Sequence, residues 1–246
     1  GIDFTTARKI FKQIAVYRGV SINAIHLHVG SQLTQITPFT TALEKTLKFL
    51  DSQKKHIAIT TVNFGGGVGI IYNDETPIDL HDYARKIEDL LIPRGLKLVL
   101  EPGRFIAGNS GVFVTKVEYI KETKTKNFAI VDGAMNDLIR PALYQAYHAI
   151  EPAKRSQVPL KTYDVVGPVC ESGDFFAKER RMPQLSEGEI IILKSAGAYG
   201  SSMSSNYNTR RKPAEIIVDR KTAHLIRKRE TYQDLIDKEI APNYLY

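Results

Sequence analysis

The sequence predicts a chain of two parts, an α/β region over roughly the first hundred residues and an all-β region after it. In the first part, segments with helical periodicity alternate with short strand-like runs, as βα units do in a doubly wound sheet or a β/α barrel. In the second part, strand-like runs follow one another with only polar turns between them, which is typical of a β-domain. The expected domains are therefore residues 1–107 and 108–246.

The α/β region is expected to contain three helices and three strands. Apolar residues at helical spacing predict helices over 7–14 and 39–50, and a third helix that begins after an N-cap at Asp79. The apolar face of that third helix is expected to comprise Leu80, Tyr83, Ala84, Ile87 and Leu91. The expected strands cover 22–29, 61–64 and 96–100, and the last reads as a buried parallel strand because its apolar run is bounded by Gly95 and Pro102.

The all-β region is expected to contain six strands. Their ranges are 112–121, 127–131, 162–166, 189–193, 215–218 and 223–227. Polar turns separate these runs, so the region is predicted to fold as one β-domain.

Each expected strand of the first region ends in a loop with chemically capable residues. The loops are His-Val-Gly-Ser at 28–31, Gly-Gly-Gly-Val-Gly at 65–69 and Glu-Pro-Gly-Arg at 101–104. Barrel enzymes build their sites at that end of the strands. The triple glycine either forms a flexible turn or presents backbone N–H groups to a phosphate. Glu101 and Arg104 form either an ion pair in a turn or two separate contacts with a cofactor. In the second case Glu101 holds a pyridinium protonated and Arg104 contacts a phosphate.

Other site classes are excluded by single residues. Ile70 occupies the last glycine position of a dinucleotide fingerprint, and no Gly-Lys-Ser/Thr follows, so the loop is not a P-loop. His26 and His28 share one face of a strand, but no cysteine or carboxylate near them in the sequence completes a metal site. No metal is therefore expected.

Composition limits the partners and the compartment. The net charge of +7 is spread along the chain, and its tightest basic clusters, at 178–181, 210–212 and 227–229, contain or lie near glutamates, so solvated faces are expected and nucleic-acid binding is not. One cysteine, Cys170, excludes a disulfide framework and indicates a reducing compartment. No run approaches the ~18 apolar residues of a membrane span, so a cytoplasmic protein without a membrane partner is expected.

The three loops, in this order, resemble the barrel domain of the fold-type III pyridoxal 5'-phosphate (PLP) decarboxylases. Four further segments narrow the resemblance to the diaminopimelate decarboxylases: 131–144, 170–174, 196–200 and 203–208. The resemblance covers essentially the whole sequence. It implies PLP as cofactor, a homodimer with its sites at the subunit interface, and decarboxylation of meso-2,6-diaminopimelate to L-lysine, the last step of lysine biosynthesis.

The resemblance also implies a role for each site residue. His28 stacks on the cofactor ring, Glu101 pairs with the ring nitrogen, and Cys170 donates the proton that replaces the carboxylate. The cofactor-binding residues are His28, Ser31, Gly65, Gly66, Gly67, Glu101, Pro102, Gly103, Arg104 and Tyr199. The substrate-binding residues are Arg104, Arg140, Tyr144, Glu171 and Tyr199. Arg140 suits the distal carboxylate of diaminopimelate, a group that ornithine lacks.

One part of the family pattern is missing. An eight-stranded barrel takes about 250 residues, but only three expected strands precede the β-domain. The family's cofactor-binding lysine lies on the first barrel strand, and Lys194, the nearest candidate here, lies in the wrong domain. We therefore expect an incomplete form, inactive alone, whose residues 1–107 are the C-terminal half of the barrel. The alternatives are an ornithine, arginine or carboxynorspermidine decarboxylase, a non-catalytic protein derived from the fold, and, on charge alone, a nucleic-acid binder.

Overall fold

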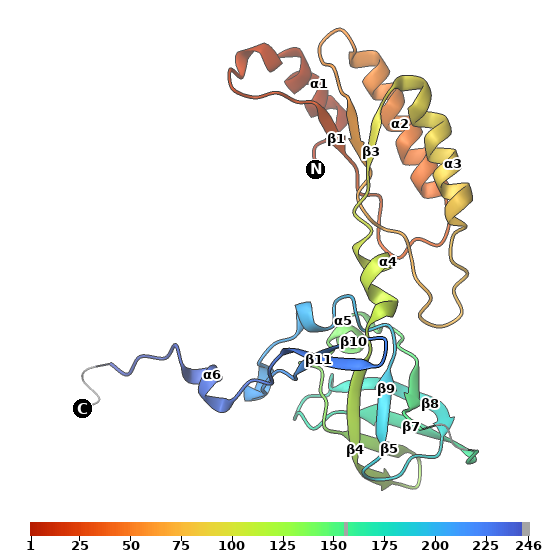
Figure 1. Ribbon diagram of the computed structural model, residues 1–246, viewed down its shortest axis with the longest axis vertical. Coiled ribbons are helices and arrows are strands. Elements are labelled where there is room, and N and C mark those ends of the chain that lie inside the picture. The colour runs from red at the N-terminus through yellow and green to blue at the C-terminus, as the bar shows by residue number, and fades with distance from the viewer. Residues whose placement is uncertain (155–156, 243–246) are drawn as a thin grey trace. The chain divides into compact units, whose positions relative to one another are not determined.

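The computed structural model describes residues 1–154 and 157–242. The chain divides into two compact units, Gly1–Ala107 and Gly108–Tyr246 (Figure 1). The first unit mixes helices and parallel strands, and the second is built on an extensive β-sheet, so the predicted fold class is confirmed. No helix within the described residues is long and apolar enough to cross a bilayer.

The first unit alternates helices with short strands. Its α-helices are α1 (Phe4–Lys12), α2 (Thr37–Gln53), α3 (Leu80–Leu91) and α4 (Gly103–Ala107). Its strands are β1 (Ala24–His26), β2 (Thr61–Asn63) and β3 (Lys97–Val99). Short 3-10 turns cover Ile14–Val16 and Ile92–Arg94. The strands form a parallel sheet in the order β1-β2-β3, with α2 and α3 against one side of it (Figure 1).

Burial explains this arrangement. Val62 of the central strand is fully buried and belongs to one apolar cluster with Phe39 and Leu43 of α2 and Ile87 of α3. Full burial of a side chain of this size contributes about 1.5–3 kcal/mol. The carboxylate of Asp79 accepts backbone N–H bonds at 2.8 and 3.1 Å in the first turn of α3, which confirms the predicted N-cap.

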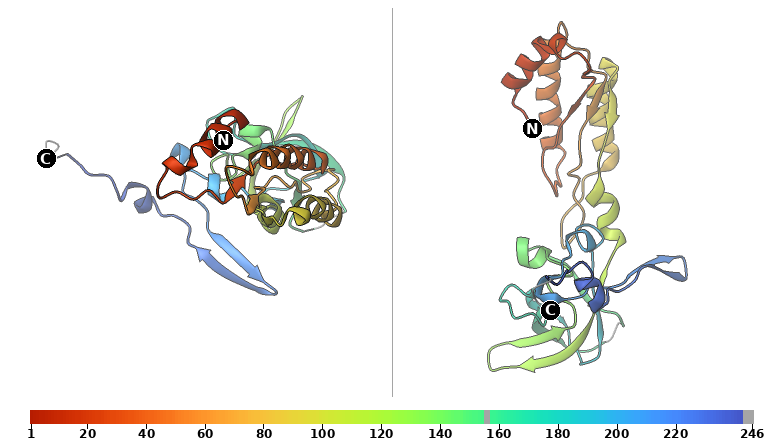
Figure 2. Two further views of the ribbon diagram at one scale, coloured as in Figure 1. Left: turned by 90° about the horizontal axis from the view of Figure 1, so that it is seen from above. Right: turned by 90° about the vertical axis from the view of Figure 1, so that its left-hand side faces the viewer.

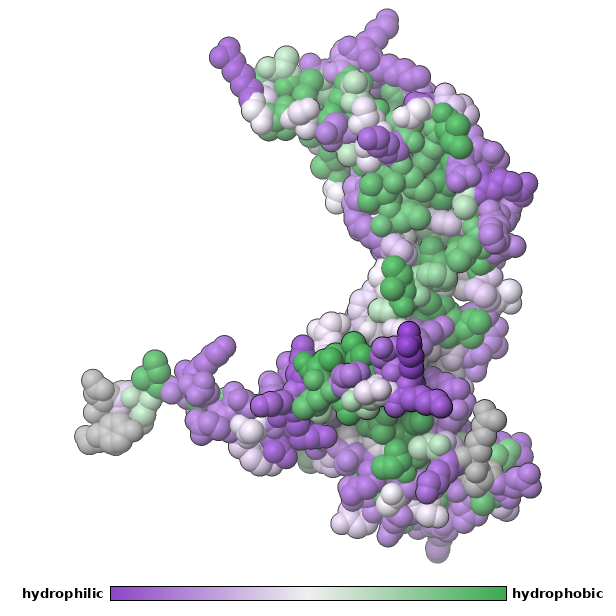
Figure 3. Space-filling model, in the orientation of Figure 1, coloured by the Kyte–Doolittle hydropathy of each residue, from purple (hydrophilic) through white to green (hydrophobic). Residues whose placement is uncertain are grey.

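Three expectations for this unit are corrected. Leu80 and Ala84 of α3 are exposed, because only the stripe around Tyr83, Ile87 and Leu91 meets the apolar cluster. The first strand is shorter than predicted. The third strand is parallel, as predicted, but all three of its residues are exposed because β3 is an edge of the sheet. Figure 3 shows apolar side chains gathered on the surface of this unit.

The second unit contains eight strands among its described residues. They are β4 (Phe113–Glu122), β5 (Asn127–Val131), β6 (Ile150–Pro152), β7 (Leu160–Val166), β8 (Phe175–Pro183), β9 (Ile190–Leu193), β10 (Glu215–Asp219) and β11 (Thr222–Arg227). The short helices are α5 (Arg140–Tyr144) and α6 (Tyr232–Ile236), with 3-10 turns at Gly108–Ser110, Ser201–Met203 and Tyr207–Thr209. The two further views in Figure 2 show the hairpin β10-β11 extending from the rest of this unit.

Six of these strands form one curled sheet. Their order is β6-β9-β4-β5-β7-β8, and every neighbouring pair is antiparallel except β5 and β7. The end strands β6 and β8 also contact each other, so the sheet curls around its core. That core contains Val117, Val131, Tyr163, Val165, Phe176, Ile191 and Leu193, all at most 1% exposed.

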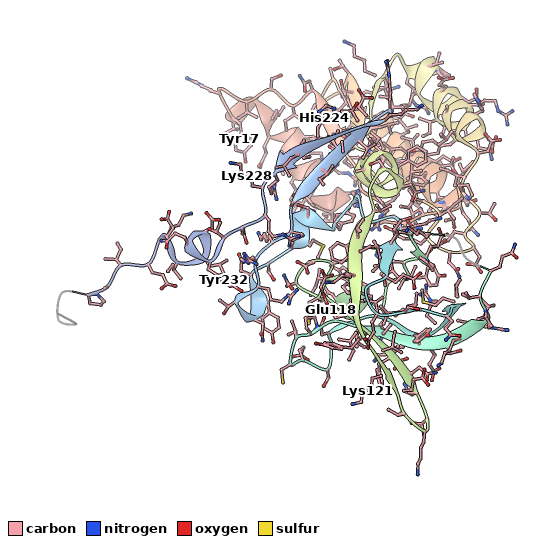
Figure 4. The ribbon with its side chains drawn as sticks, turned by 60° about the horizontal axis from the view of Figure 1, so that its bottom comes forward. Tyr17, Glu118, Lys121, His224, Lys228 and Tyr232 are labelled. Carbon is pink, nitrogen blue, oxygen red and sulfur yellow. The ribbon has the colours of Figure 1, made fainter. Side chains whose placement is uncertain are left out.

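The six predicted strands of this unit are all present, and two others were not predicted. The longer one, β8, includes charged residues 178–181, which sequence analysis assigned to a solvated cluster. The strand tolerates them because Lys178, Glu179 and Arg181 are exposed, and Asp164 shapes the backbone beside them. Its carboxylate accepts the N–H of Glu179 at 2.7 Å, where the β7–β8 register shifts and Glu179 has a φ of 51°. The hairpin β10-β11, with His224 labelled in Figure 4, is exposed along nearly its whole length.

Candidate functional site

The three loops that carry the predicted cofactor residues meet at one edge of the first sheet. The strands run parallel and in register, and their matched last residues are His26, Asn63 and Val99. Backbone bonds join the loops beyond the strands: the N–H of Glu101 donates to the Gly65 carbonyl at 2.8 Å, and that of Leu33 to the Gly67 carbonyl at 2.8 Å. The loops therefore form a continuous rim at the carboxyl ends of the strands, where barrel enzymes place their sites.

Glycine is required at the centre of this rim. A Cβ on Gly66 would lie 2.5 Å from the Glu101 carbonyl oxygen, and one on Gly67 would lie 2.4 Å from the Gly30 carbonyl oxygen. The His28 ring lies beside the same loop, with its Nδ1 3.0 Å from the place of a Cβ on Gly65. Any side chain would push the three loops apart, so the glycines serve close packing and leave the loop backbone open to a ligand.

Glu101 is held by side chains that the sequence analysis did not assign to the site. Asn63 Nδ2 donates to its Oε1 at 2.7 Å, and His26 Nε2 lies 3.7 Å from its Oε2. About half of the Glu101 side chain remains exposed. The sequence contained a sign of these contacts, because His26 and Asn63 end neighbouring strands and the polar ends of parallel strands lie at one edge of a sheet. The described residues contain no group of three or more side chains that could hold a metal ion.

Arg104 joins two loops of the rim. Its guanidinium donates to Ser31 Oγ at 2.9 Å and to the Tyr72 hydroxyl at 2.7 Å. Tyr72 was not predicted as a site residue. The N–H of Gly103 donates to the Glu101 carbonyl at 2.8 Å, so the backbone of this predicted cofactor-binding residue is engaged inside its own loop.

The set of donors fits a phosphorylated pyridine cofactor. The guanidinium of Arg104, the hydroxyl of Ser31 and the glycine backbone can bind a phosphate. The anchored carboxylate of Glu101 can pair with a protonated ring nitrogen. These groups all lie on one rim of the first unit, so the residues present could hold PLP.

In the second unit, Arg140 begins the short helix α5 and is 7% exposed. Its Nη1 lies 2.9 Å from Nε2 of His148, a fully buried histidine that the sequence analysis did not single out. Burial, with smaller contributions from the positive charges of Arg140 and Arg180, lowers the pKa of His148 to about 4. Tyr144 ends the same helix and is exposed.

The turn before Arg140 is fixed by the predicted motif at 203–208. The N–H of Ser205 donates to the Asn136 carbonyl at 2.9 Å, and Asn136 Nδ2 donates back to the Ser205 carbonyl at 3.2 Å. Arg210 Nε donates to Asn136 Oδ1 at 2.9 Å. Two motifs about 70 residues apart are therefore joined by hydrogen bonds.

Cys170 and Glu171 lie exposed in a loop organised by a buried carboxylate. Asp174 accepts the N–H of Val169 and the N–H of Met135, both at 2.7 Å. Burial raises the pKa of Asp174, against the effect of these two hydrogen bonds. Asp174 thus ties the base of the cysteine loop to the turn that leads to Arg140.

Two tyrosines of this unit lie in the motifs at 196–200 and 203–208. Tyr199 follows β9 in the left-handed region, with a φ of 61°, a conformation that is uncommon for non-glycine residues and clusters at functional sites. Tyr207 was not predicted, and its hydroxyl lies 3.5 Å from Glu171 Oε2. The predicted residues thus fall into two sets, one on the rim of the first unit and one on the loops of the second.

Comparisons with known proteins identify relatives along most of the chain. Residues 15–197 match the family model described as pyridoxal-dependent decarboxylase, C-terminal sheet domain. The chain is 48% identical over 236 residues to a diaminopimelate decarboxylase of Pseudomonas aeruginosa and 47% identical over 237 residues to one of Vibrio cholerae. Each alignment covers 96% of this chain and 57% of the relative, so the chain spans little more than half the length of these proteins.

A solved structure gives a similar picture. The crystal structure of diaminopimelate decarboxylase from Helicobacter pylori complexed with L-lysine matches with a TM-score of 0.91 and 40% identity. The match covers 97% of this chain and 60% of that one. Both units of the chain thus have counterparts in an experimentally determined decarboxylase.

Proposed function

This chain belongs to the pyridoxal-dependent decarboxylase family, and from that premise we propose that it takes part in the decarboxylation of meso-2,6-diaminopimelate to L-lysine and carbon dioxide. The observation that carries the proposal is the rim of the first unit, where Glu101 and Arg104 follow β3; Glu101 is anchored by the last residue of β2, and Arg104 by side chains of neighbouring loops. The chain spans 57% of its curated relatives, so the remaining part of the enzyme is proposed to come from residues outside this sequence.

The cofactor is proposed to lie on the rim. Bound PLP supplies the electron sink that accepts the electron pair left behind when carbon dioxide departs. Glu101 holds a proton at the ring nitrogen, and Asn63 fixes its carboxylate by a 2.7 Å hydrogen bond. His28 covers the ring, while Ser31, the glycines at 65–67 and Arg104 bind the phosphate, with Gly103 and Pro102 shaping the loop. Tyr199 of the second unit is proposed to add a further contact to the cofactor.

The substrate is proposed to be selected at its distal end. Arg140 binds the distal carboxylate with its planar, always-charged fork, and Tyr144 from the same helix adds a hydroxyl. Glu171 binds the distal ammonium, with Arg104 and Tyr199 completing the contacts. Ornithine has an ammonium but no carboxylate at that end, so an arginine here favours diaminopimelate.

Cys170 is proposed to deliver the proton that takes the place of the lost carboxylate. The exposure of the thiol supports this role, because an acid must reach the substrate carbon. The loop that carries Cys170 is fixed through Asp174, so the thiol is attached to an ordered base. An exposed loop of this kind also suits the proposed homodimer, in which it completes the site of the partner subunit. A single cysteine agrees with a cytoplasmic enzyme.

The substrate assignment is tested with Arg140→Ala in the full-length enzyme. We expect the variant to lose roughly 2–5 kcal/mol in kcat/KM for meso-diaminopimelate, the scale for removing one partner of a buried charge pair. Carbon dioxide release from diaminopimelate, ornithine and arginine is compared under PLP saturation, with cofactor absorbance as a measure of loading. Arg181→Ala, at an exposed arginine of β8, is the matched control.

Three results would contradict parts of the proposal. Unchanged diaminopimelate kinetics in Arg140→Ala removes Arg140 from the substrate site. Preferred turnover of ornithine or arginine by the wild type makes the related decarboxylases the better assignment. Turnover of none of these substrates by fully loaded enzyme favours a non-catalytic relative.

A further inference from the structure

A chain of contacts through His148 connects Arg140 to the end of β9. The guanidinium of Arg140 meets Nε2 of His148 at 2.9 Å, and Nδ1 of the same ring lies 2.7 Å from the Lys194 carbonyl oxygen. His148 is itself held from β8, because Arg180 donates to its backbone carbonyl at 2.8 Å. His148 is completely buried, so water does not compete for these contacts.

The partners determine the protonation state of the ring. A backbone carbonyl can only accept, so Nδ1 carries the hydrogen, and a guanidinium can only donate, so Nε2 has its lone pair free to accept. Protonation of Nε2 would set an N–H against an N–H and place two positive charges within contact. The lowered pKa of His148 agrees with the neutral ring that this geometry requires.

A neutral hydrogen-bond acceptor and a carboxylate have different effects on an arginine that they contact. A carboxylate partner would orient the guanidinium but also neutralise it and occupy its fork. The His148 ring accepts one hydrogen bond and leaves the positive charge in place. Arg180, the other cation that acts on the ring, stacks 4.0 Å from the Tyr147 ring centroid, and the side chain of Lys194 is paired with Glu151 at 2.7 Å.

We propose that His148 is a positioning residue for Arg140: its neutral ring accepts a hydrogen bond from the guanidinium and fixes its orientation without adding a negative charge beside it. This inference rests on the proposed function, in which Arg140 binds the distal carboxylate of diaminopimelate. It identifies a specificity-determining residue that never touches the substrate. It also explains why a histidine, with a donor and an acceptor on opposite sides of one rigid ring, occupies a fully buried position.

Two isosteric variants separate positioning from packing. In His148→Gln the side-chain amide reaches the place of Nε2 and can still accept from Arg140. In His148→Asn the amide reaches only the place of Nδ1, so it keeps the Lys194 contact and loses the acceptor. Neither side chain titrates, and both are polar, so a merely structural role predicts similar damage from the two.

The readout is the ratio of affinities for L-lysine and cadaverine, measured by calorimetry on the full-length, PLP-loaded enzyme. L-Lysine retains the carboxylate that the reaction does not remove, and cadaverine lacks it. We expect His148→Asn to reduce the preference for L-lysine about 10- to 100-fold, the scale of a hydrogen bond to a charged group, and His148→Gln to preserve it. If His148→Asn does not fold, as judged by circular dichroism, His148→Leu replaces it with the same expectation.

Arg140→Ala separates a failure of the positioning role from a failure of the proposed function. If that variant leaves the ratio unchanged, Arg140 does not bind the carboxylate and the proposed function is wrong at this position. If Arg140→Ala lowers the ratio while His148→Asn does not, the substrate site stands and the positioning role is overturned. A lowered ratio in His148→Gln overturns the positioning role by itself.

Discussion

Glu101 in the first unit and Arg140 in the second are both proposed to meet an oppositely charged group, but the chain holds them differently. The Glu101 side chain is about half exposed, and its contacts come from the polar ends of two neighbouring strands. Arg140 is 7% exposed and meets a buried ring that is itself fixed on two sides. The charge of Arg140 is thus oriented in advance in a low-dielectric setting, where interactions are stronger.

The sheets of the two units also differ in how completely they are enclosed. The first unit has a three-stranded parallel sheet whose edge strand β3 exposes Leu98 and Val99 at 39% and 42%. In the second unit the end strands of the six-stranded sheet contact each other around a buried core. Parallel sheets are found almost only with both faces covered. The comparison teaches that the sheet of the second unit closes around its own core, whereas the sheet of the first unit leaves an apolar edge strand exposed.

The largest expected effect concerns the chain of residues 1–246 expressed alone. We expect it to associate strongly and to show no diaminopimelate turnover, because exposed edges and apolar strands invite pairing. Amide hydrogen exchange should be fast in β1–β3 and slow in β4, β5 and β7. PLP should be held without a covalent bond, since Lys194 belongs to the second unit and not to the rim of the first unit that is proposed to hold the cofactor.

Borohydride reduction followed by mass spectrometry checks this expectation. A stoichiometric pyridoxyl adduct on Lys194, together with L-lysine production, would show that no further barrel strand is needed. Equal protection of the two sheets from exchange would remove the contrast between the units.

The next largest effect concerns Cys170. Cys170→Ala in the full-length enzyme should reduce kcat by about 10²–10⁴-fold, the usual contribution of a positioned acid, while the cofactor absorbance persists. Asp174→Asn is the informative companion, because its carboxylate anchors the cysteine loop through Val169 and Met135 without contacting the thiol. We expect a smaller loss of turnover there. Full activity of Cys170→Ala would assign protonation to another group.

The sequence was sufficient for features that depend on local chemistry. The α3 N-cap at Asp79, the parallel βα pattern and six strands of the second unit followed from periodicity and turn residues. Strand β8 was missed because its charges at 178–181 read as a surface cluster, whereas the contact of Asp164 with Glu179 that shapes it lies across the sheet.

The parts of the site that the sequence did not predict depend on contacts between residues far apart in the chain. The loops at 28–31, 65–69 and 101–104 were recognisable because each follows a strand. Which side chains hold Glu101 depends on strand register, and which group meets Arg140 depends on the packing of α5, β8 and β9. His148 lies in no recognisable sequence motif, so only its burial and its two ring contacts identify it as the partner of Arg140.

The smallest effect expected here is a dependence of stability on pH that belongs to the second unit. His148 has a pKa of about 4 in the folded chain, and a histidine in an unfolded chain has a pKa of about 6.5. Between these values the unfolded state binds a proton that the folded state does not, so acid favours unfolding. The stability that a neutral His148 maintains is fully present above pH 6.5 and is lost progressively as the pH falls toward 4.

The size of this loss follows from the shift. A difference of about 2.5 pH units, at 1.36 kcal/mol each, amounts to roughly 3 kcal/mol. Burial also raises the pKa values of Asp137 and Asp174, and these groups act in the opposite direction, because a raised carboxyl pKa lowers stability as the pH rises. The contribution of His148 must therefore be isolated by a variant rather than read from the wild-type curve.

Urea unfolding of the full-length enzyme between pH 4 and pH 7.5, followed by a probe in the second unit, measures the slope. His148→Gln should flatten the acid dependence by most of the expected amount, because glutamine does not titrate. His224→Gln, at an exposed histidine of β11, is the matched control and should leave the slope as it is in the wild type. Parallel slopes in the wild type and His148→Gln would mean that the pKa of His148 is the same in the folded and unfolded chains, so that the folded chain takes up this proton near pH 6.5. A ring protonated there cannot accept from Arg140 in mildly acidic solution, so that result would contradict the contrast between a buried, neutral partner for Arg140 and the half-exposed setting of Glu101.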